Sequence, residues 1–176
     1  METKEPQNKQ DNEEYEEEDD EFEQEFEILS LDYPYQDYRY KIIIIGDSGV
    51  GKTCLTVKAT TGEFSPKNSP TLGFDYSPFL MKYKDTVLKL EIWDTCGQET
   101  YRALIKSFFV NSSLAIIVYA IDDINSFNSI EEWVRQCRNE CSPETKFILI
   151  GNKNDLEKEK SVLIFYFYYN LYKGEK

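Results

Sequence analysis

Apolar runs separated by polar turns divide the chain from about residue 40 onward. Residues 41–45, 113–121 and 146–150 are largely apolar, the first with four consecutive isoleucines, which predicts strands buried on both faces. Residues 87–93 alternate between apolar and polar side chains, as a half-buried strand does. Helices are predicted over 52–61 and over 125–137, the second capped by an Asn or Ser, and a loop is predicted over 62–76. Because strands and helices alternate, the predicted fold class is α/β with a mostly parallel sheet and right-handed crossovers.

Charge separates an N-terminal arm from the rest of the chain. Residues 1–40 hold 16 acidic and three basic side chains, whereas residues 41–176 hold 17 of each, within a net charge of −13. Such an acidic stretch cannot bury enough surface to fold, so residues 1–38 are predicted to be disordered, either as a docking arm for a basic partner or as a solvated extension. A domain is expected over 39–160 and an atypical apolar, aromatic tail over 161–176.

Composition excludes several classes of site. The chain has no histidine, which removes histidine acid–base catalysis and a zinc site of the Cys/His type. The four cysteines predict reduced thiols rather than a disulfide framework, although Cys137 and Cys141 could share one helix face. The balanced domain does not suggest nucleic-acid binding. With no signal peptide, no myristoylation site and no apolar run that could span a bilayer, we expect a cytoplasmic protein, peripheral to endomembranes only through partners, and a monomer.

Residues 46–53 read G-D-S-G-V-G-K-T, a phosphate-binding loop between a buried strand and a helix. The glycines let backbone N–H groups point inward at a helix N-terminus and form an anion cradle. A lysine in this pattern reaches the outer phosphates, and the following Thr hydroxyl is a hard oxygen ligand for Mg²⁺. The residues expected to contact the phosphates are Gly46, Asp47, Ser48, Gly49, Val50, Gly51, Lys52, Thr53 and Cys54.

Three later segments narrow the family. Thr71 lies in S-P-T-L-G-F-D-Y, residues 93–99 read W-D-T-C-G-Q-E, and residues 151–155 read G-N-K-N-D after a buried strand. With the phosphate-binding loop, and in this order, they resemble the small GTPases of the Ras superfamily over residues 40–156. The resemblance implies a P-loop NTPase fold with helices on both faces of the sheet, and GTP or GDP with Mg²⁺ as ligands.

The resemblance assigns roles around the γ-phosphate and the metal. Thr53 and Thr71 would ligate Mg²⁺, and Asp94 would hold it through water. Gly97 would donate its backbone N–H to the γ-phosphate. Gln98 would orient the attacking water, so that the implied catalytic residues are Gln98, Lys52 and Thr71.

The same resemblance assigns the base site. Phe64 fits the aromatic residue that packs against guanine, and Lys153 would lie along the phosphate loop and the base. Asn152 and Asp155 would read the base, with the Asp155 carboxylate accepting from N1 and the exocyclic amine. Adenine offers no such donor pair, which argues against an ATP-dependent kinase or motor.

Within the superfamily the chain looks most like the Rab branch. Tyr76, Trp93 and Phe108 match the aromatic triad that Rab proteins present to effectors, although plain core packing explains these residues equally well. Activating proteins, exchange factors and effectors would bind through residues 62–76 and 94–110. These features predict a slow GTPase switch in vesicle trafficking or signalling.

The C-terminal residues depart from the family. After Asp155 the sequence shows no counterpart of the usual last strand, guanine-contacting loop and closing helix, and residues 162–169 read V-L-I-F-Y-F-Y-Y. No terminal cysteine is present for prenylation. Either the chain is truncated, or residues 162–169 add to the sheet as a substitute strand. The rival functional hypothesis is therefore a non-catalytic interaction protein with an incomplete guanine site.

Overall fold

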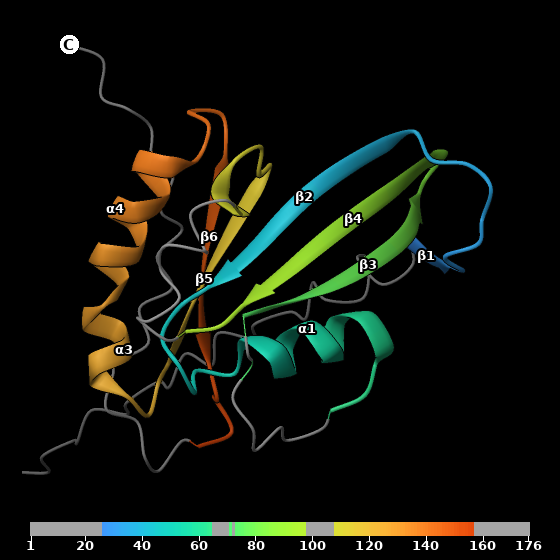
Figure 1. Ribbon diagram of the computed structural model, residues 1–176. Helices are drawn as coiled ribbons and strands as arrows, with labels where there is room; N and C mark the ends of the chain where they lie inside the picture. The colour runs from blue at the N-terminus through green and yellow to red at the C-terminus, as the bar shows by residue number, and fades with distance from the viewer. Residues whose placement is uncertain (1–25, 65–70, 72, 98–107, 157–176) are drawn as a thin grey trace, which may run out of the picture.

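The computed structural model describes residues 26–64, 71, 73–97 and 108–156, and these residues contain one six-stranded sheet flanked by helices (Figure 1). The strand order is β1-β3-β4-β2-β5-β6. The elements, in chain order, are β1 (Phe26–Leu29), β2 (Tyr38–Ile45), α1 (Lys52–Thr61), β3 (Phe74–Tyr83), β4 (Thr86–Thr95), β5 (Leu114–Ala120), α3 (Ile124–Asn128), α4 (Ile130–Glu140) and β6 (Lys146–Asn152).

The sheet is mostly parallel, as predicted. Strand β2 pairs in parallel with β4 on one side and β5 on the other, and β5 pairs in parallel with β6. Only β3 and β1 run antiparallel to their neighbours. Helix α1 lies on one face of the sheet, and α3 and α4 lie on the other (Figure 1). This arrangement is a P-loop NTPase fold of the α/β class.

The isoleucines of β2 divide the core into two halves. Ile43 and Ile45 are buried in the cluster that includes residues of α4, while Ile42 and Ile44 are buried in the cluster that includes Leu55 of α1. Successive side chains of a strand point to opposite faces, so an unbroken apolar run is what a central strand between two helical layers requires. The prediction of a doubly buried strand at this point is confirmed.

Two strands differ from the sequence-based expectation. Strand β3 begins at Phe74, inside the range 62–76 that was expected to be a loop, because it is held along its whole length by the antiparallel pairing with β4. Strand β1 lies within residues 1–38, which were expected to be disordered. Its four residues pair with Leu80 to Tyr83 of β3, and three of the four are exposed, so backbone pairing with the edge of β3 rather than apolar burial orders this part of the acidic arm.

The predicted helix over 125–137 is two helices. Asp123, rather than an Asn or Ser, caps α3 by accepting a hydrogen bond from the backbone N–H of Asn125 at 2.9 Å. The break lies at Ser129, which ends α3 and precedes α4. Hydroxyl and amide side chains that bond to nearby backbone groups favour such helix ends, and Ser129 donates to the carbonyl of Asn125.

Several predicted features lie outside the described residues. These are the acidic residues before 26, Gln98 and most of the segment 94–110, and the tail over 161–176. Within the described part of the chain, no helix has the length and apolar character needed to cross a membrane.

Candidate functional site

The phosphate-binding loop connects β2 to α1 at the carboxyl end of the parallel strands. Gly46, Gly49 and Gly51 have φ values of 143°, 80° and 95°, which side-chain-bearing residues rarely adopt. Gly46 is also fixed by space, because a Cβ there would lie 2.1 Å from the carbonyl oxygen of Val118. The loop therefore has the curled backbone that turns N–H groups toward an anion at the start of α1.

Lys52 lies within this loop. Its Nζ donates to the carbonyl oxygens of Gly46 at 2.8 Å and Asp47 at 2.7 Å, and its side chain is only 6% exposed. Burial lowers the pKa of Lys52 from 10.5 to about 8, and the nearby carboxylates of Asp94 and Asp47 oppose that shift only in part. A buried ammonium beside a cradle of N–H groups is suited to an anionic ligand, because the negative charge of the ligand would stabilise the protonated lysine.

This lowered pKa predicts proton uptake when a phosphate ligand binds. Above pH 8 the ligand-free Lys52 has largely lost its proton, and bound phosphates raise its pKa and recover the proton. On GDP binding, uptake should rise from roughly a quarter of a proton at pH 7.5 to roughly three quarters at pH 8.5. Calorimetric titration in two buffers of different ionisation enthalpy measures this number, and equal uptake at the two pH values would contradict the assignment.

The lowered pKa of Lys52 also makes the stability of the ligand-free domain depend on pH. The folded state loses the Lys52 proton near pH 8, whereas the unfolded chain keeps it to 10.5. Between these values the unfolded state binds more protons, so this group makes the free energy of unfolding increase with pH. Stability and phosphate affinity should therefore change in opposite directions over that range.

Three hard oxygen donors converge beside the start of α1. The Thr53 hydroxyl donates to Oδ2 of Asp94 at 2.5 Å and lies 2.8 Å from the Thr71 hydroxyl. Asp94 is fully buried near the end of β4, and Thr71 lies outside any strand or helix, in the connection before β3. Two hydroxyls and a carboxylate form a donor set that suits Mg²⁺. The donor set therefore fits the metal that the sequence predicted for these residues.

Gly97 lies directly against the phosphate-binding loop. A Cβ on Gly97 would approach the carbonyl carbon of Asp47 and the nitrogen of Ser48 to 2.3 Å each, so only glycine fits at this distance. The end of β4 is thus brought to the loop by backbone contact. Gln98, the predicted catalytic residue, follows immediately but lies outside the described residues.

The predicted base-reading segment begins where β6 ends. Asn152 donates from Nδ2 to the carbonyl oxygen of Val50 at 2.8 Å, and the same atom would lie 2.3 Å from a Cβ on Gly51. Asn152 therefore joins the segment after β6 to the phosphate-binding loop. Asp155 is exposed on the following turn, and Phe64 after α1 is 70% exposed. Both side chains are accessible to a ligand.

Lys153 has a partner that the sequence analysis missed. Its backbone has a φ of 67°, and its Nζ lies 3.2 Å from Oδ2 of Asp122, which follows β5. The strands β5 and β6 are parallel neighbours, so residues after their carboxyl ends meet at one edge of the sheet. The pair is partly exposed, and it orients the lysine rather than adding much stability.

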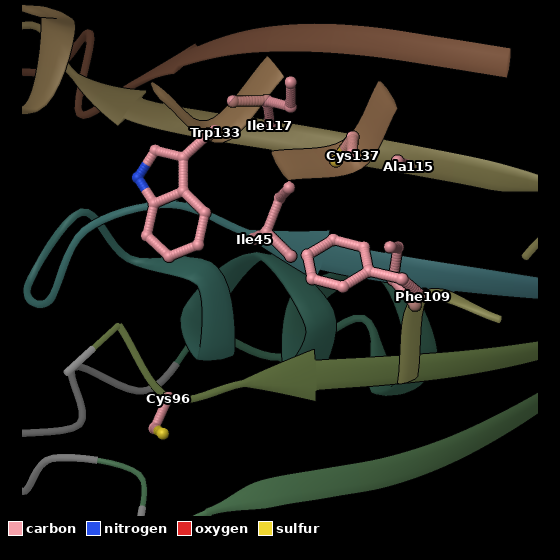
Figure 2. Packing of buried hydrophobic residues seen from close by; sticks show 8 residues of the cluster. Ile45, Cys96, Phe109, Ala115, Ile117, Trp133 and Cys137 are labelled. Carbon is pink, nitrogen blue, oxygen red and sulfur yellow. The ribbon is translucent and has the colours of Figure 1, made fainter. Parts of the chain in front are cut away.

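A second missed contact ties α4 to the phosphate-binding loop. The indole Nε1 of Trp133 donates to Oδ1 of Asp47 at 2.8 Å, and Trp133 is 3% exposed. In Figure 2 its ring and that of Phe109 flank Ile45 of β2. A buried indole N–H needs an acceptor, and the helix pattern of 125–137 gave the only hint that Trp133 faces inward.

The aromatic residues singled out in the sequence form one cluster, joined by Phe74. Ring centroids are 4.5 Å apart for Phe74 and Phe108, 5.0 Å for Tyr76 and Trp93, and 5.3 Å for Trp93 and Phe108. Tyr76 is 39% and Phe74 47% exposed, whereas Trp93 and Phe108 pack against the core. The cluster therefore combines core packing with an exposed aromatic surface.

Comparison with known proteins agrees with this geometry. The family model described as "Ras family" matches residues 41–165, which includes the phosphate-binding loop, Thr71, Asp94 and the segment after β6. The chain belongs to the Ras family. Its similarity is to Rab-type members of that family, as the match of Tyr76, Trp93 and Phe108 to the Rab aromatic triad had suggested.

Three relatives illustrate the similarity. Ras-related protein Rab-11B of Dictyostelium discoideum is 40% identical over 126 residues, covering 72% of this chain and 57% of that protein. Ras-related protein RABA1c of Arabidopsis thaliana is 38% identical over 120 residues (68% and 56%), and RABD2b of the same plant is 35% identical over 129 residues (73% and 64%). This Ras-family chain thus spans somewhat more than half the length of the relatives it matches.

Proposed function

We propose that this chain binds GTP and GDP together with Mg²⁺ and slowly hydrolyses GTP, acting as a molecular switch. The observation that carries the proposal is the convergence of Thr53, Thr71 and Asp94 beside the buried Lys52. Thr71 comes from the connection between α1 and β3, whereas Lys52 and Thr53 lie on the first turn of α1 and Asp94 lies on β4. A ligand that holds Thr71 beside Thr53 would therefore fix the conformation of that connection, and its loss would release the connection.

The chain's own residues would perform distinct tasks. Backbone N–H groups of the loop and the Lys52 ammonium would hold the phosphates, and Thr53, Thr71 and Asp94 would hold Mg²⁺, which neutralises phosphate charge when bound. Gly97 would donate its N–H to the terminal phosphate, and its closeness to Asp47 and Ser48 supports that role. Gln98 would orient the attacking water.

Discrimination for guanine would come from the segment after β6. Asn152 is already bonded to the phosphate-binding loop, which fixes the distance between the base-reading residues and the phosphate cradle. Asp155 would accept two hydrogen bonds from the guanine edge, with Lys153 held in place by Asp122. Phe64 would pack against the base from the other side of the site.

Partner proteins would read the switch. The Phe74, Tyr76, Trp93 and Phe108 cluster adjoins the connection that carries Thr71, so its exposed rings are placed to report the state of that connection. We propose that effectors, exchange factors and activating proteins bind through 62–76 and 94–110, and that the process served is vesicle trafficking or signalling. An activating protein would accelerate GTP hydrolysis, since the sequence places no arginine at the site to act in cis.

A second candidate function is a non-catalytic interaction protein. It is favoured by the exposed aromatic rings of Phe74 and Tyr76, which a partner protein could bind whether or not nucleotide is present. In that case the Asn152 bond to Val50 would serve only to fix the loop, and nucleotide affinity would be weak.

Nucleotide titration separates the two functions. Purified full chain is titrated with a fluorescent GDP analogue in Mg²⁺, and the complex is competed with GTP and then with ATP. Saturable binding that GTP displaces and ATP does not is the expected result. Absence of saturable binding would sink the switch and favour the interaction protein, and displacement by ATP would contradict the base assignment.

A further inference from the structure

Two thiols at the end of α4 form a cluster that the nucleotide site does not use. Cys137 is fully buried in the core, and Cys141 is the half-buried residue that ends the helix. The backbone N–H of Cys141 donates to the carbonyl of Cys137 at 2.8 Å, and their side chains share a hydrogen bond. One thiol of the pair is therefore accessible, and the other lies behind it.

The surroundings make the two thiols chemically different. The hydrogen bond from Cys137 lowers the pKa of Cys141, aided by Thr145 and by the positive charge of Lys41, while burial and Glu140 oppose this. Conversely, the hydrogen bond to Cys141 and burial raise the pKa of Cys137. Cys141 is the thiol that an oxidant in solution can reach, and its lowered pKa favours the reactive thiolate, whereas the raised pKa of the buried Cys137 keeps that thiol protonated.

We propose that Cys141 and Cys137 form a peroxide-sensitive dithiol switch that closes to a disulfide and loosens the phosphate-binding loop. A hydroperoxide is the oxidant. The Cys141 sulfur attacks one peroxide oxygen, the O–O bond breaks, and the other oxygen leaves as hydroxide and takes up a proton to become water. Cys141 becomes a sulfenic acid.

The second step closes the disulfide. Once Cys141 is a neutral sulfenic acid, the charge that held the proton on Cys137 is gone. The Cys137 sulfur then attacks the Cys141 sulfur, the S–O bond breaks, and the hydroxyl leaves with the Cys137 proton as water. Overall, two thiols and one hydrogen peroxide yield one disulfide and two waters.

The geometry permits this bond at the helix end. Residues four apart on a helix have Cβ atoms about 5–6 Å apart, whereas a disulfide needs about 3.5–4.5 Å. Cys141 has already left the helical conformation, with φ −84° and ψ 164°. The last turn of α4 can therefore tighten without disturbing the rest of the helix's hydrogen bonds, and the strain falls on Cys137 and the core around it.

Helix α4 connects this strained end to the candidate nucleotide site. Trp133 lies one turn before Cys137 on the same buried face of α4 and in the same core cluster (Figure 2). Its Nε1 donates to Oδ1 of Asp47 in the phosphate-binding loop. Displacement of Cys137 shifts the packing of the Trp133 indole and weakens its hydrogen bond to Asp47. This consequence rests on the proposed nucleotide-binding function, and GDP release should become roughly three- to tenfold faster on oxidation.

Peptide mapping of the full chain tests the chemistry without any assay of nucleotide. Trypsin cleaves after Arg135, Arg138 and Lys146, so the two thiols fall in separate peptides, and a disulfide appears as a linked pair 136–138 with 139–146. We expect this pair after equimolar hydrogen peroxide, its loss on reduction, and unmodified thiols at Cys54 and Cys96 in the same digest. Oxidation of Cys141 to the sulfinic acid without the linked pair, or earlier oxidation of Cys54, would overturn the proposal.

Variants and a second readout complete the test. Cys141→Ser, at the half-buried position, should abolish the linked peptides and leave Cys137 reduced. Cys137→Ala should leave a sulfenic acid on Cys141 that dimedone traps, which keeps the test valid if either variant is less stable. Faster GDP release in the oxidised chain but not in Cys141→Ser is expected, and equal release in both would refute the switch. If neither form binds GDP, the nucleotide function fails while the peptide map still judges the disulfide.

Discussion

Asp155→Asn should change the base that the chain prefers from guanine to xanthine. The carboxylate of Asp155 would accept from two donors on the guanine edge, whereas an amide offers one acceptor and one donor. That donor opposes the guanine amine but matches the oxygen that xanthine carries at the same position. With charge-assisted hydrogen bonds of about 1.5–3 kcal/mol each, GDP affinity should fall about 10²- to 10⁴-fold.

The measurement is competition of the fluorescent GDP analogue with GDP and with xanthosine diphosphate. Asn154→Ala is a matched control, because Asn154 is the exposed neighbour on the same turn. It should leave both affinities unchanged. If Asp155→Asn retains GDP affinity and gains none for xanthosine diphosphate, Asp155 does not read the base.

Lys52→Met should abolish nucleotide binding while leaving the ligand-free fold nearly intact. The ammonium would contribute charge-assisted bonds to the phosphates, and its loss should weaken GDP binding at least about 10²-fold. The ligand-free domain loses only the donations to the carbonyls of Gly46 and Asp47, and it is relieved of a buried charge whose pKa has fallen to about 8. Methionine fills a similar volume in the 6%-exposed site.

Thermal melting without nucleotide and GDP titration of the same variant measure the two effects. Lys58→Met, on the exposed side of the same helix, is the control and should bind GDP normally. Proton uptake on binding should also disappear with Lys52. A variant that melts far below the parent chain and still binds GDP would reverse the assignment, because Lys52 would then be a structural residue.

The phosphate-binding loop and the central strands were predictable because their signals are local. Gly46, Gly49 and Gly51 owe their identity to positive φ angles in a short turn, and the isoleucines of β2 owe theirs to burial on both faces. In each case the structural constraint acts on the same residues whose identities form the sequence pattern. The convergence of Thr71 on Thr53 followed from the resemblance to a family, which no periodicity in this sequence supplies.

The contacts that sequence reasoning missed join residues distant in the chain. Trp133 meets Asp47 across 86 positions, and Lys153 meets Asp122 across 31. Neither pair has a spacing that a helix or strand would impose. Likewise, β1 exists because β3 offers an edge at the right distance, and an acidic composition gave no sign of that partner.

The division of 125–137 into two helices shows a different limit. Asp123 competes for the cap with nearby polar residues of similar propensity, and Ser129 sits where either continuation or a break is locally allowed. A contact outside the helix holds α3 in place, since the buried Ser126 hydroxyl accepts from the backbone N–H of Ala120, the last residue of β5, at 3.0 Å. Local preference alone could not decide between the two arrangements.

The strand pairing at the outer edge of the sheet bears on solubility. Strand β1 closes the edge of β3 only over Leu80 to Tyr83, and Pro78, which has no N–H to offer, lies in the part that β1 leaves uncovered. Strand β1 is the outermost strand, and it directly follows residues 1–25, which include 13 acidic and two basic residues. Two copies approaching edge to edge would bring these charges together, so electrostatic repulsion opposes fibre-like stacking at this margin of the sheet.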